Sequence, residues 1–283
     1  MKTPSAPDTS TKLYCVIGHP VAHSLGPAMH NHALAETGVN AVYLAFDVVD
    51  VASAVAGIRA LSIAGVSVTV PHKTAVMDYL DRIDETAAAI GAVNTVVNDN
   101  GTLTGYNTDA YGAVAALEEH AGDLSGRRVA ILGAGGAARA VAFGASRKGA
   151  VIHIANRTPE KGEALASELN ASFTPLSGLG DLECDILVNT TSAGMHPNTN
   201  DIPVSPEVLR PGIVVMDIIY NPLTTRLLSE ARKRGCTTID GVAMFVYQGA
   251  RQFHLFTGIR PPIESMKQIV YQSLKQRSHC PGA

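Results

Sequence analysis

Three features are absent from this sequence, and each absence argues against a class of protein. No apolar run reaches the roughly 20 residues needed to cross a bilayer, so we expect no membrane-spanning helix. Positive charge is not in excess, because 22 Lys and Arg stand against 25 Asp and Glu, a formal net charge of −3. We therefore expect no nucleic-acid partner and no binding to an anionic membrane surface. The N-terminal segment has no apolar core typical of a secretory signal.

Cysteine is scarce, and the four cysteines are scattered without a CxxC pair: Cys15, Cys184, Cys236 and Cys280. This spacing favours reduced thiols in a cytoplasmic protein over a disulfide framework. Four histidines crowd one stretch: His19, His23, His30 and His32. Neither cysteine nor carboxylate joins them in a metal-ligand pattern, and their spacing is not that of a zinc protease helix. We therefore expect no metal site.

A glycine-rich turn between two apolar runs is the most informative feature that is present. Val129–Leu132 reads as a strand, Gly133–Ala138 as a turn of sequence GAGGAA opening a helix, and Val151–Ala155 as the next strand. In such a unit, the first glycine permits the turn and the second lets the backbone approach a pyrophosphate. The free N–H groups at the helix start then face the phosphates. The stretch predicts a Rossmann-type dinucleotide-binding domain.

The residues after the second of these strands predict NADP rather than NAD. An NAD site usually has Asp or Glu about 20 residues beyond the first glycine, to bind the ribose hydroxyl. This chain has Asn156-Arg157-Thr158 there, followed by Lys161, with no carboxylate at the position. Arg157 can bind a 2′-phosphate through two parallel hydrogen bonds, and Thr158 can add a hydroxyl donor. The alternative is that Arg157 and Lys161 form only a solvated surface.

Strands and helices alternate along most of the chain, which favours parallel sheets with crossover helices. We expect strands at 13–18, 41–46, 65–70, 92–98, 103–106, 129–132, 151–155, 185–189, 214–218 and 237–240. We expect helices at 27–37, 51–60, 73–80, 84–90, 108–119, 161–169, 223–234, 244–257 and 263–277. The 283 residues are enough for two domains.

The predicted fold is therefore two-domain α/β. An N-terminal, mostly parallel α/β domain would bind the substrate, and a Rossmann-type domain would bind NADP. The C-terminal helices would return to the first domain, which would span residues 12–111 and 244–277, leaving 112–243 to the second. A ligand cleft is expected between the two.

Four polar clusters in the first domain follow or precede expected strands: His23–Pro27, Ser67–Lys73, Ala92–Thr95 and Gly105–Asp109. Polar groups just beyond parallel strands line the crevice in which α/β proteins bind ligands. These clusters belong to nine motifs: HSLGPAMHN, VTVPHK, GAVNT, GYNTD, GAGGAAR, NRT, NTTSAGM, DIIYNP and GVAMFVYQGARQF.

With these motifs in family order over roughly residues 13 to 275, the chain resembles the shikimate dehydrogenase family of shikimate and quinate dehydrogenases. The resemblance implies NADPH-dependent, reversible reduction of 3-dehydroshikimate to shikimate in aromatic amino-acid biosynthesis. It implies a cytoplasmic oxidoreductase, a monomer or a homodimer, acting on a small cyclic hydroxy acid.

The resemblance assigns catalysis to Lys73 and Asp109. When hydride adds to a ring ketone, its oxygen gains negative charge, which a nearby ammonium stabilises and can protonate. Asp109 would hold Lys73 and bind a neighbouring hydroxyl. The sequence leaves open which of the two carries the proton. The alternative is that neither residue is catalytic, so that Lys73 is a surface residue and Asp109 a helix cap.

The remaining site residues also follow from the resemblance. The substrate contacts are Ser24, Thr69, Lys73, Asn94, Asn107, Asp109, Tyr220 and Gln248. The cofactor contacts are Gly133, Ala134, Gly135, Gly136, Ala137, Asn156, Arg157, Thr158, Lys161, Thr190, Thr191, Ser192, Ile218, Gly241 and Met244. For Met244, plain core packing is the alternative.

Two positions depart from the family pattern, and both fall on the substrate side. The family usually has a second serine two residues after Ser24, where this chain has Gly26, and commonly has asparagine in place of Ser67. A missing hydroxyl to a carboxylate weakens binding by about 1–3 kcal/mol unless water or Tyr220 replaces it. Alternatively, the space at Gly26 suits quinate, whose carboxylate-bearing carbon has an extra hydroxyl. A non-catalytic NADP-binding sensor is the alternative outside the enzymes.

Overall fold

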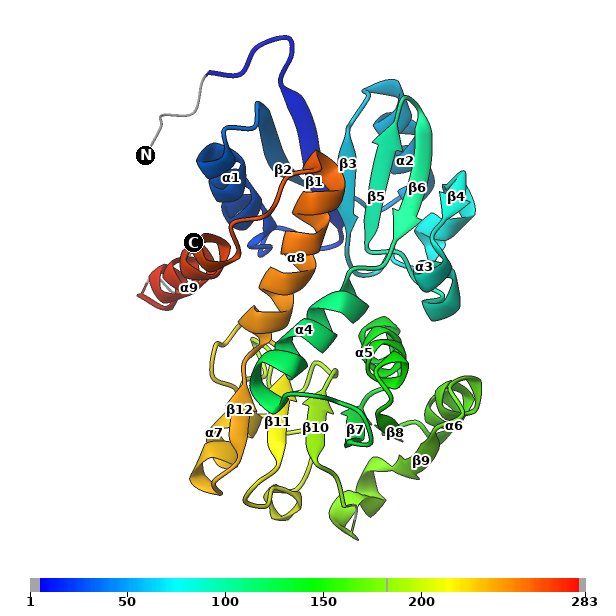
Figure 1. Cartoon of the computed structure of the whole chain (residues 1–283), viewed down its shortest axis with the longest axis vertical. Coiled ribbons are helices and arrows are strands. Elements are labelled where there is room, and N and C mark those ends of the chain that lie inside the picture. The colour runs from blue at the N-terminus through cyan, green and yellow to red at the C-terminus, as the bar shows by residue number, and fades with distance from the viewer. Residues whose placement is uncertain (1–5, 182, 280–283) are drawn as a thin grey trace. The chain divides into compact units, whose positions relative to one another are not determined.

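The computed structural model describes residues 6–181 and 183–279, which form two compact units (Figure 1). One unit contains the chain up to residue 108 and from 248 onward, and the other contains residues 109–247. Helix α8 (Gly241–Thr257) begins in the second unit and ends in the first. Cys280 lies outside the described residues.

The first unit is built on a six-stranded sheet of order β2-β1-β3-β5-β6-β4. Its strands are β1 (Lys12–Gly18), β2 (Ala41–Asp47), β3 (Gly65–Val68), β4 (Arg82–Ile83), β5 (Thr95–Asp99) and β6 (Thr102–Tyr106). Its helices, besides the end of α8, are α1 (Gly26–Thr37), α2 (Val51–Ala60), α3 (Glu85–Ile90), α9 (Ile263–His279) and the 3₁₀ turn η1 (Ala75–Tyr79).

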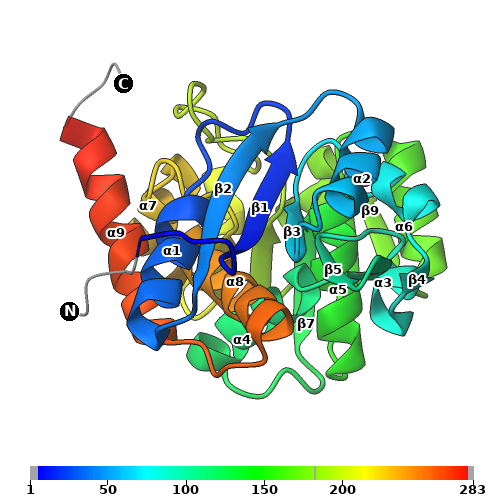
Figure 2. The same cartoon turned by 90° about the horizontal axis from the view of Figure 1, so that it is seen from above.

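Side chains of this sheet alternate between two covered faces, as the two-residue repeat of a strand requires. On one face, Val66 and Val68 of β3 join an apolar cluster with residues of α2, η1 and α3. Ser67 points to the other face, where it contacts Tyr43 and α8. Helix α1 lies between β2 and α9 on this side (Figure 2). The face that carries Ser67 is the one on which the substrate-side polar groups meet.

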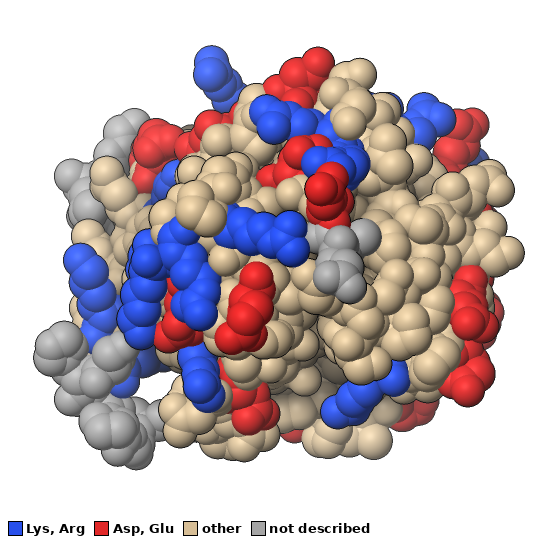
Figure 3. All heavy atoms as spheres, turned by 90° about the horizontal axis from the view of Figure 1, so that it is seen from below, with Lys and Arg blue, Asp and Glu red and all other residues tan. Residues whose placement is uncertain are grey.

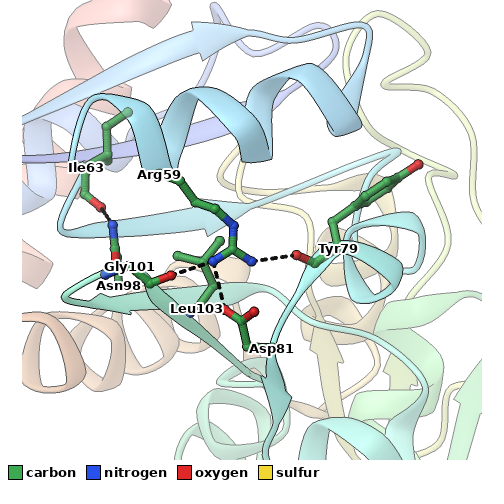
Figure 4. Close-up of polar contacts among 7 residues, drawn as sticks. All are labelled: Arg59, Ile63, Tyr79, Asp81, Asn98, Gly101 and Leu103. Carbon is green, nitrogen blue, oxygen red and sulfur yellow. Dashed lines mark hydrogen bonds and ion pairs between the residues drawn. The ribbon is translucent and has the colours of Figure 1, made fainter.

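A set of polar contacts fixes one edge of the sheet, near the β5–β6 turn (Figure 4). The guanidinium of Arg59 donates to the Asp81 carboxylate at 2.8 Å and to the carbonyls of Gly101 and Tyr79 at 2.5 and 3.2 Å. Asp81 in turn accepts from the N–H of Leu103 at 2.7 Å. This edge lies at the amino ends of β1 and β3. The loops of the first unit that are expected to bind the substrate lie at the opposite edge, beyond the carboxyl ends of these strands.

The second unit has a six-stranded, all-parallel sheet of order β12-β11-β10-β7-β8-β9. Its strands are β7 (Arg128–Leu132), β8 (Val151–Asn156), β9 (Ser172–Pro175), β10 (Ile186–Asn189), β11 (Val214–Asp217) and β12 (Thr237–Ile239). Its helices, besides the start of α8, are α4 (Asp109–Ala121), α5 (Gly136–Arg147), α6 (Pro159–Glu168), α7 (Arg226–Lys233) and the 3₁₀ turns η2 (Leu176–Asp181) and η3 (Pro206–Val208). Apolar clusters cover both faces.

The α/β fold class is confirmed, while three details differ from the sequence prediction. The helix expected at 73–80 is only the 3₁₀ turn η1, which is too short to gain from helical cooperativity. The short strands β4 and β9 carry too little apolar periodicity to be recognised. In the first unit, β5 pairs antiparallel with β3, and it also pairs antiparallel with β6 across the tight turn that was expected between these two strands.

Two surface properties bear on partners. Over the described residues, no helix combines the length and the apolar character needed to cross a membrane. Figure 3 shows Lys and Arg side chains interspersed with Asp and Glu on one face of the molecule.

His30 gives the first unit a pH-dependent contribution to stability. Its ring is 2% exposed and stacks on Tyr43 with the ring centres 4.3 Å apart. Burial lowers the pKa of His30 from 6.5 to about 4, and a hydrogen bond to Gln252 opposes this only in part. Between these values the unfolded chain binds the extra proton, so the free energy of unfolding falls as the pH falls. The total effect is about 3 kcal/mol.

We expect His30→Gln to remove this dependence. Urea unfolding at several pH values from about 7 to about 4 should show a smaller loss of stability for the variant than for the unchanged protein. The exposed His254 serves as control, since His254→Gln should keep the original slope. Equal slopes for His30→Gln and the unchanged protein would contradict the assignment.

Candidate functional site

Strand register brings the substrate-side segments together at one edge of the first sheet. Strands β1 and β3 run parallel, with Ile17 opposite Val68 near their carboxyl ends. Strand β5 starts at this edge, because Thr95 pairs antiparallel with Ser67. The loops that follow β1, β3 and β6, and the segment before β5, therefore meet here. They carry Ser24, Thr69, Lys73, Asn94 and Asn107.

Asn94 has a fully buried side chain whose amide orientation is set from inside the unit. Its Oδ1 accepts from the N–H of Thr108 and from the hydroxyl of Thr95, each at 2.8 Å. Its Nδ2 donates to Thr108 Oγ1 at 3.0 Å and lies 3.5 Å from Gln248 Oε1. The Gln248 oxygen is also 3.4 Å from Thr108 Oγ1. Two expected substrate contacts, Asn94 and Gln248, are thus adjacent.

Lys73 and Asn107 are tied to the same segment through the backbone. The carbonyl of Lys73 accepts from the N–H of Val93 at 2.8 Å, and Asn107 Nδ2 donates to the carbonyl of Ala92 at 2.9 Å. The Lys73 side chain is half-buried. Asp109 is 6% exposed and begins α4 directly after Thr108. Both charged side chains have interaction partners.

Ser24 and Gly26 lie beside the hydroxyl of Tyr43, which the sequence did not single out. Ser24 Oγ accepts from the N–H of Gly26 at 3.1 Å. A Cβ added to Gly26 would lie 3.2 Å from Ser24 Oγ and 3.4–3.5 Å from the Tyr43 ring and hydroxyl. Glycine therefore fits here with less crowding than serine would. Thr69 is half-buried at the end of β3.

Tyr220 lies in the second unit, apart in the chain from the substrate-side segments of the first. There it follows β11 and packs against Phe245 with ring centres 4.9 Å apart. Within the first unit, the hydroxyls of Ser24 and Tyr43 are the ones that adjoin Gly26.

The glycine turn of the second unit lies between β7 and α5, next to the end of β10. The sheet order changes direction between β7 and β10, which is where open α/β sheets bind ligands. Gly133 has φ of +116°, and a Cβ there would lie 2.7 Å from Thr190 Oγ1, so both backbone conformation and space require glycine. A Cβ added to Gly135 or Gly136 would meet open space. Ala134 and Ala137 are half-buried beside them.

The residues expected near the 2′-phosphate are exposed at the end of β8. Arg157 and Lys161 have no hydrogen bond or ion pair within the described part of the chain. Thr158 occupies the N-cap position of α6, yet its hydroxyl does not cap the helix. Asn156 Nδ2 donates to the carbonyl of Thr158 at 2.8 Å, which holds the turn.

The segment after β10 has its hydroxyl groups directed inward. Thr190 Oγ1 donates to the carbonyl of Leu132 at 2.6 Å, and Thr191 Oγ1 donates to Asn189 Oδ1 at 2.7 Å. Ser192 is exposed. These two bonds hold the turn after β10 in place.

A buried carboxylate that the sequence analysis missed connects β10 to β11. Asp217, in the DIIYNP motif, accepts from Asn189 Nδ2 at 3.0 Å, Ile219 N–H at 3.1 Å and Thr225 Oγ1 at 2.7 Å. Burial raises the pKa of Asp217 to about 6, although these hydrogen bonds oppose the shift. The position of Asp217 at the end of an apolar strand was the available signal.

Three further positions lie where α8 begins. A Cβ added to Gly241 would lie 2.4 Å from the carbonyl oxygen of Ile218, so α8 starts in direct contact with the segment after β11. Ile218 is half-buried. Met244 is 6% exposed and packs in the apolar core of the second unit, as its alternative interpretation stated.

Three of the four clustered histidines have side-chain partners that differ from one to the next. His19 pairs with Asp47 at 3.0 Å, His32 lies 2.5 Å from Ser265 Oγ, and His30 stacks on Tyr43. Across residues 6–181 and 183–279, no three His, Cys, Asp or Glu side chains gather in a group that could hold a metal ion.

Three family models match this chain. Residues 16–96 match a shikimate dehydrogenase substrate binding domain, residues 115–206 a shikimate/quinate 5-dehydrogenase model, and residues 241–271 a shikimate 5'-dehydrogenase C-terminal domain. The matches cover both units.

Individual relatives are similar over nearly the whole chain. The NADP(+) shikimate dehydrogenase of Moorella thermoacetica is 47% identical, with 97% of each chain covered. A crystal structure of a shikimate dehydrogenase in complex with NADP+ has a TM-score of 0.92 at 46% identity, covering 96% of this chain and 98% of the other. The Thermus thermophilus enzyme in complex with NADP(H) and shikimate has a TM-score of 0.87 at 37% identity, with coverages of 93% and 100%.

A neighbour with another activity is also similar. The quinate dehydrogenase of Corynebacterium glutamicum, in complex with NAD, has a TM-score of 0.87 at 32% identity, covering 93% of this chain and 99% of the other.

Proposed function

Because this chain belongs to the shikimate dehydrogenase family, we propose that it catalyses the reversible, NADP-dependent reduction of 3-dehydroshikimate to shikimate. The observation that best supports this substrate is the gathering of Ser24, Thr69, Asn94 and Gln248 in one unit. Amides and hydroxyls suit a polyhydroxylated ring, since each amide offers both donors and an acceptor. We also infer a cytoplasmic location and a monomeric or homodimeric state.

Lys73 and Asp109 are proposed to serve the reacting carbonyl. Bound NADPH supplies a hydride to the ring carbon, and the carbonyl oxygen then takes up a proton to become the hydroxyl of shikimate. The Lys73 ammonium stabilises the charge on that oxygen and donates the proton. Asp109 directly follows Thr108, whose N–H donates to Asn94, and it is the first residue of α4.

The cofactor residues of the second unit fit a phosphorylated dinucleotide. The first amides of α5 have no intrahelical acceptor, and the open space at Gly135 and Gly136 lets a pyrophosphate approach them. Arg157 and Lys161 bring positive charge to the end of β8 and form no ion pair with any residue that the structure describes. This arrangement favours NADP over NAD.

Quinate is the second candidate substrate, and Gly26 favours it. The position lies in the loop that resembles the carboxylate-binding segment and has no side chain, so only the Ser24 and Tyr43 hydroxyls adjoin it. Quinate differs from shikimate by an added hydroxyl on the carbon that bears the carboxylate. The lack of a side chain at position 26 is therefore compatible with that hydroxyl.

Lys73→Ala should lower kcat by about a thousandfold, because the charge stabilisation and proton donation are both lost. Stopped-assay turnover of shikimate and fluorescence titration with NADPH measure the two effects, and NADPH binding should be unchanged. The exposed Lys12 is a matched control, and Lys12→Ala should keep full turnover. Unchanged turnover in Lys73→Ala would remove this lysine from the mechanism, and NADPH binding without turnover in the unchanged protein would indicate a sensor.

Arg157→Asp should lower kcat/KM for NADP by about 10- to 100-fold, since it replaces a charge-assisted pair with repulsion. Activity with NAD should stay the same or increase, so the preference flattens or reverses. Arg147, exposed at the far end of α5, provides the control: Arg147→Asp makes the same charge change and should leave the preference intact. A preference unaltered by Arg157→Asp would refute the 2′-phosphate assignment.

Substrate choice can be tested with shikimate and quinate in parallel. We expect shikimate to be turned over more efficiently than quinate by the unchanged protein. Gly26→Ser should lower the KM for shikimate by about tenfold, because it restores a hydroxyl for the carboxylate. Gly26→Ala adds the same Cβ without the hydroxyl and should give no such gain. Comparable turnover of quinate, or none of shikimate, would make quinate the substrate.

A further inference from the structure

Gln252 of α8 uses both N–H positions and the oxygen of its buried side-chain amide. Its Nε2 donates to the backbone carbonyl of Asn94 at 3.2 Å and to Thr95 Oγ1 at 3.1 Å. Its Oε1 accepts from Ser67 Oγ at 2.8 Å. The residue is 3% exposed. A glutamine with both ends of its amide bonded in this way has one orientation only.

The direction of each hydrogen bond around Gln252 is determined by its neighbours. The Asn94 carbonyl can only accept, so Nε2 must face it and Oε1 must face Ser67. Ser67 accepts from the Tyr43 hydroxyl at 2.6 Å, which leaves its own proton for Gln252. Thr95 Oγ1 accepts from Gln252, so its single proton is donated onward to Asn94 Oδ1.

This order of donors settles what Asn94 can offer a ligand. With Thr95 and the Thr108 N–H both donating to Oδ1, the two lone pairs of that oxygen are occupied. An inverted amide would place N–H groups against these donors, leaving buried groups unsatisfied. Asn94 therefore presents its Nδ2 on the side of Gln248. A substrate oxygen at this place would meet a hydrogen-bond donor.

Gln252 also accounts for the departure at Ser67. Ser67 and Thr95 are paired across β3 and β5, so their side chains lie on the same face of the sheet. Ser67 has a short side chain without an amide, so it cannot donate an amide N–H to Thr95. Gln252 enters from α8 and provides it instead, one helical turn from Gln248.

We propose that Gln252 is a positioning residue for substrate binding, which acts together with Ser67 across the β3–β5 pair. The two residues fix the donor order that turns Nδ2 of Asn94 toward Gln248, where a ring oxygen would meet a hydrogen-bond donor. The inference rests on the proposed function, because it takes Asn94 to be a substrate contact.

A double-mutant cycle tests whether an asparagine amide at position 67 can take the place of the Gln252 amide. Gln252→Ala should raise the KM for shikimate about tenfold, since Thr95 and Asn94 lose their fixed donors, while the KM for NADP stays within about twofold. Ser67→Asn alone should also impair shikimate binding, because the added amide overlaps Gln252. The combined variant should recover to within about threefold of the unchanged KM, because the asparagine amide then fills the vacated space.

Controls separate positioning from general loss of structure. His254→Gln alters an exposed position on the same helix and should change neither KM, and thermal unfolding is recorded for every variant. If Gln252→Ala does not fold, Gln252→Met, which keeps the volume without the amide, is measured in its place. A purely structural role would lower stability without selective loss of shikimate binding and without rescue in the double variant. Either that result or an unchanged shikimate KM in the Gln252 variants would overturn the proposal.

Asn94→Asp distinguishes failure of this inference from failure of the proposed function. The substitution keeps the shape and the accepting oxygen but removes the N–H donors, so the KM for shikimate should increase. If it does not, the assignment of Asn94 as a substrate contact is wrong. If it increases while the Gln252 variants behave like the unchanged protein, only the role of Gln252 is wrong.

Discussion

The pairing of Ser67 with Thr95 is the constraint on which the substrate side of this protein depends. Because β3 and β5 meet antiparallel at this pair, the segment before β5 lies beside the carboxyl ends of β1 and β3. The same pairing turns both side chains toward α8, and Gln252 links them. A shift of one residue would move these polar groups into the apolar cluster on the opposite face.

A comparable constraint organises the second unit. Gly133 approaches Thr190 closely, and Thr190 donates to the carbonyl of Leu132, so the turn after β7 packs directly against the segment after β10. Asn189 and Asp217 extend this arrangement to β11 through buried hydrogen bonds. The carboxylate remains buried because three donors surround it, in keeping with the rule that buried charge must be hydrogen-bonded. Backbone amides and exposed basic groups are thus presented at one edge of the sheet.

Local patterns were sufficient to predict the α/β class, the glycine turn and most helices and strands, because apolar periodicity and turn chemistry act over a few residues. Asn94, Lys73 and Asn107 were predicted as site residues from motifs near strand ends, and hydrogen bonds link Lys73 and Asn107 to the segment that precedes Asn94. Strand β4 was not predicted, and the 3₁₀ turn at 75–79 was predicted as a longer helix. Both are too short to carry a periodic signal, and tertiary packing stabilises them.

The sequence by itself determined the chemical inventory: the glycine turn, the absence of a carboxylate after β8, and the polar groups beyond the strands of the first unit. It also revealed the departures at Gly26 and Ser67. Only the tertiary structure decided what surrounds those two positions. Tyr43 lies next to Gly26 and Gln252 next to Ser67. The reason is physical, since hydrogen bonds between residues 185 positions apart depend on the strand register and on how α8 packs on the sheet, and neither leaves a local mark in the sequence.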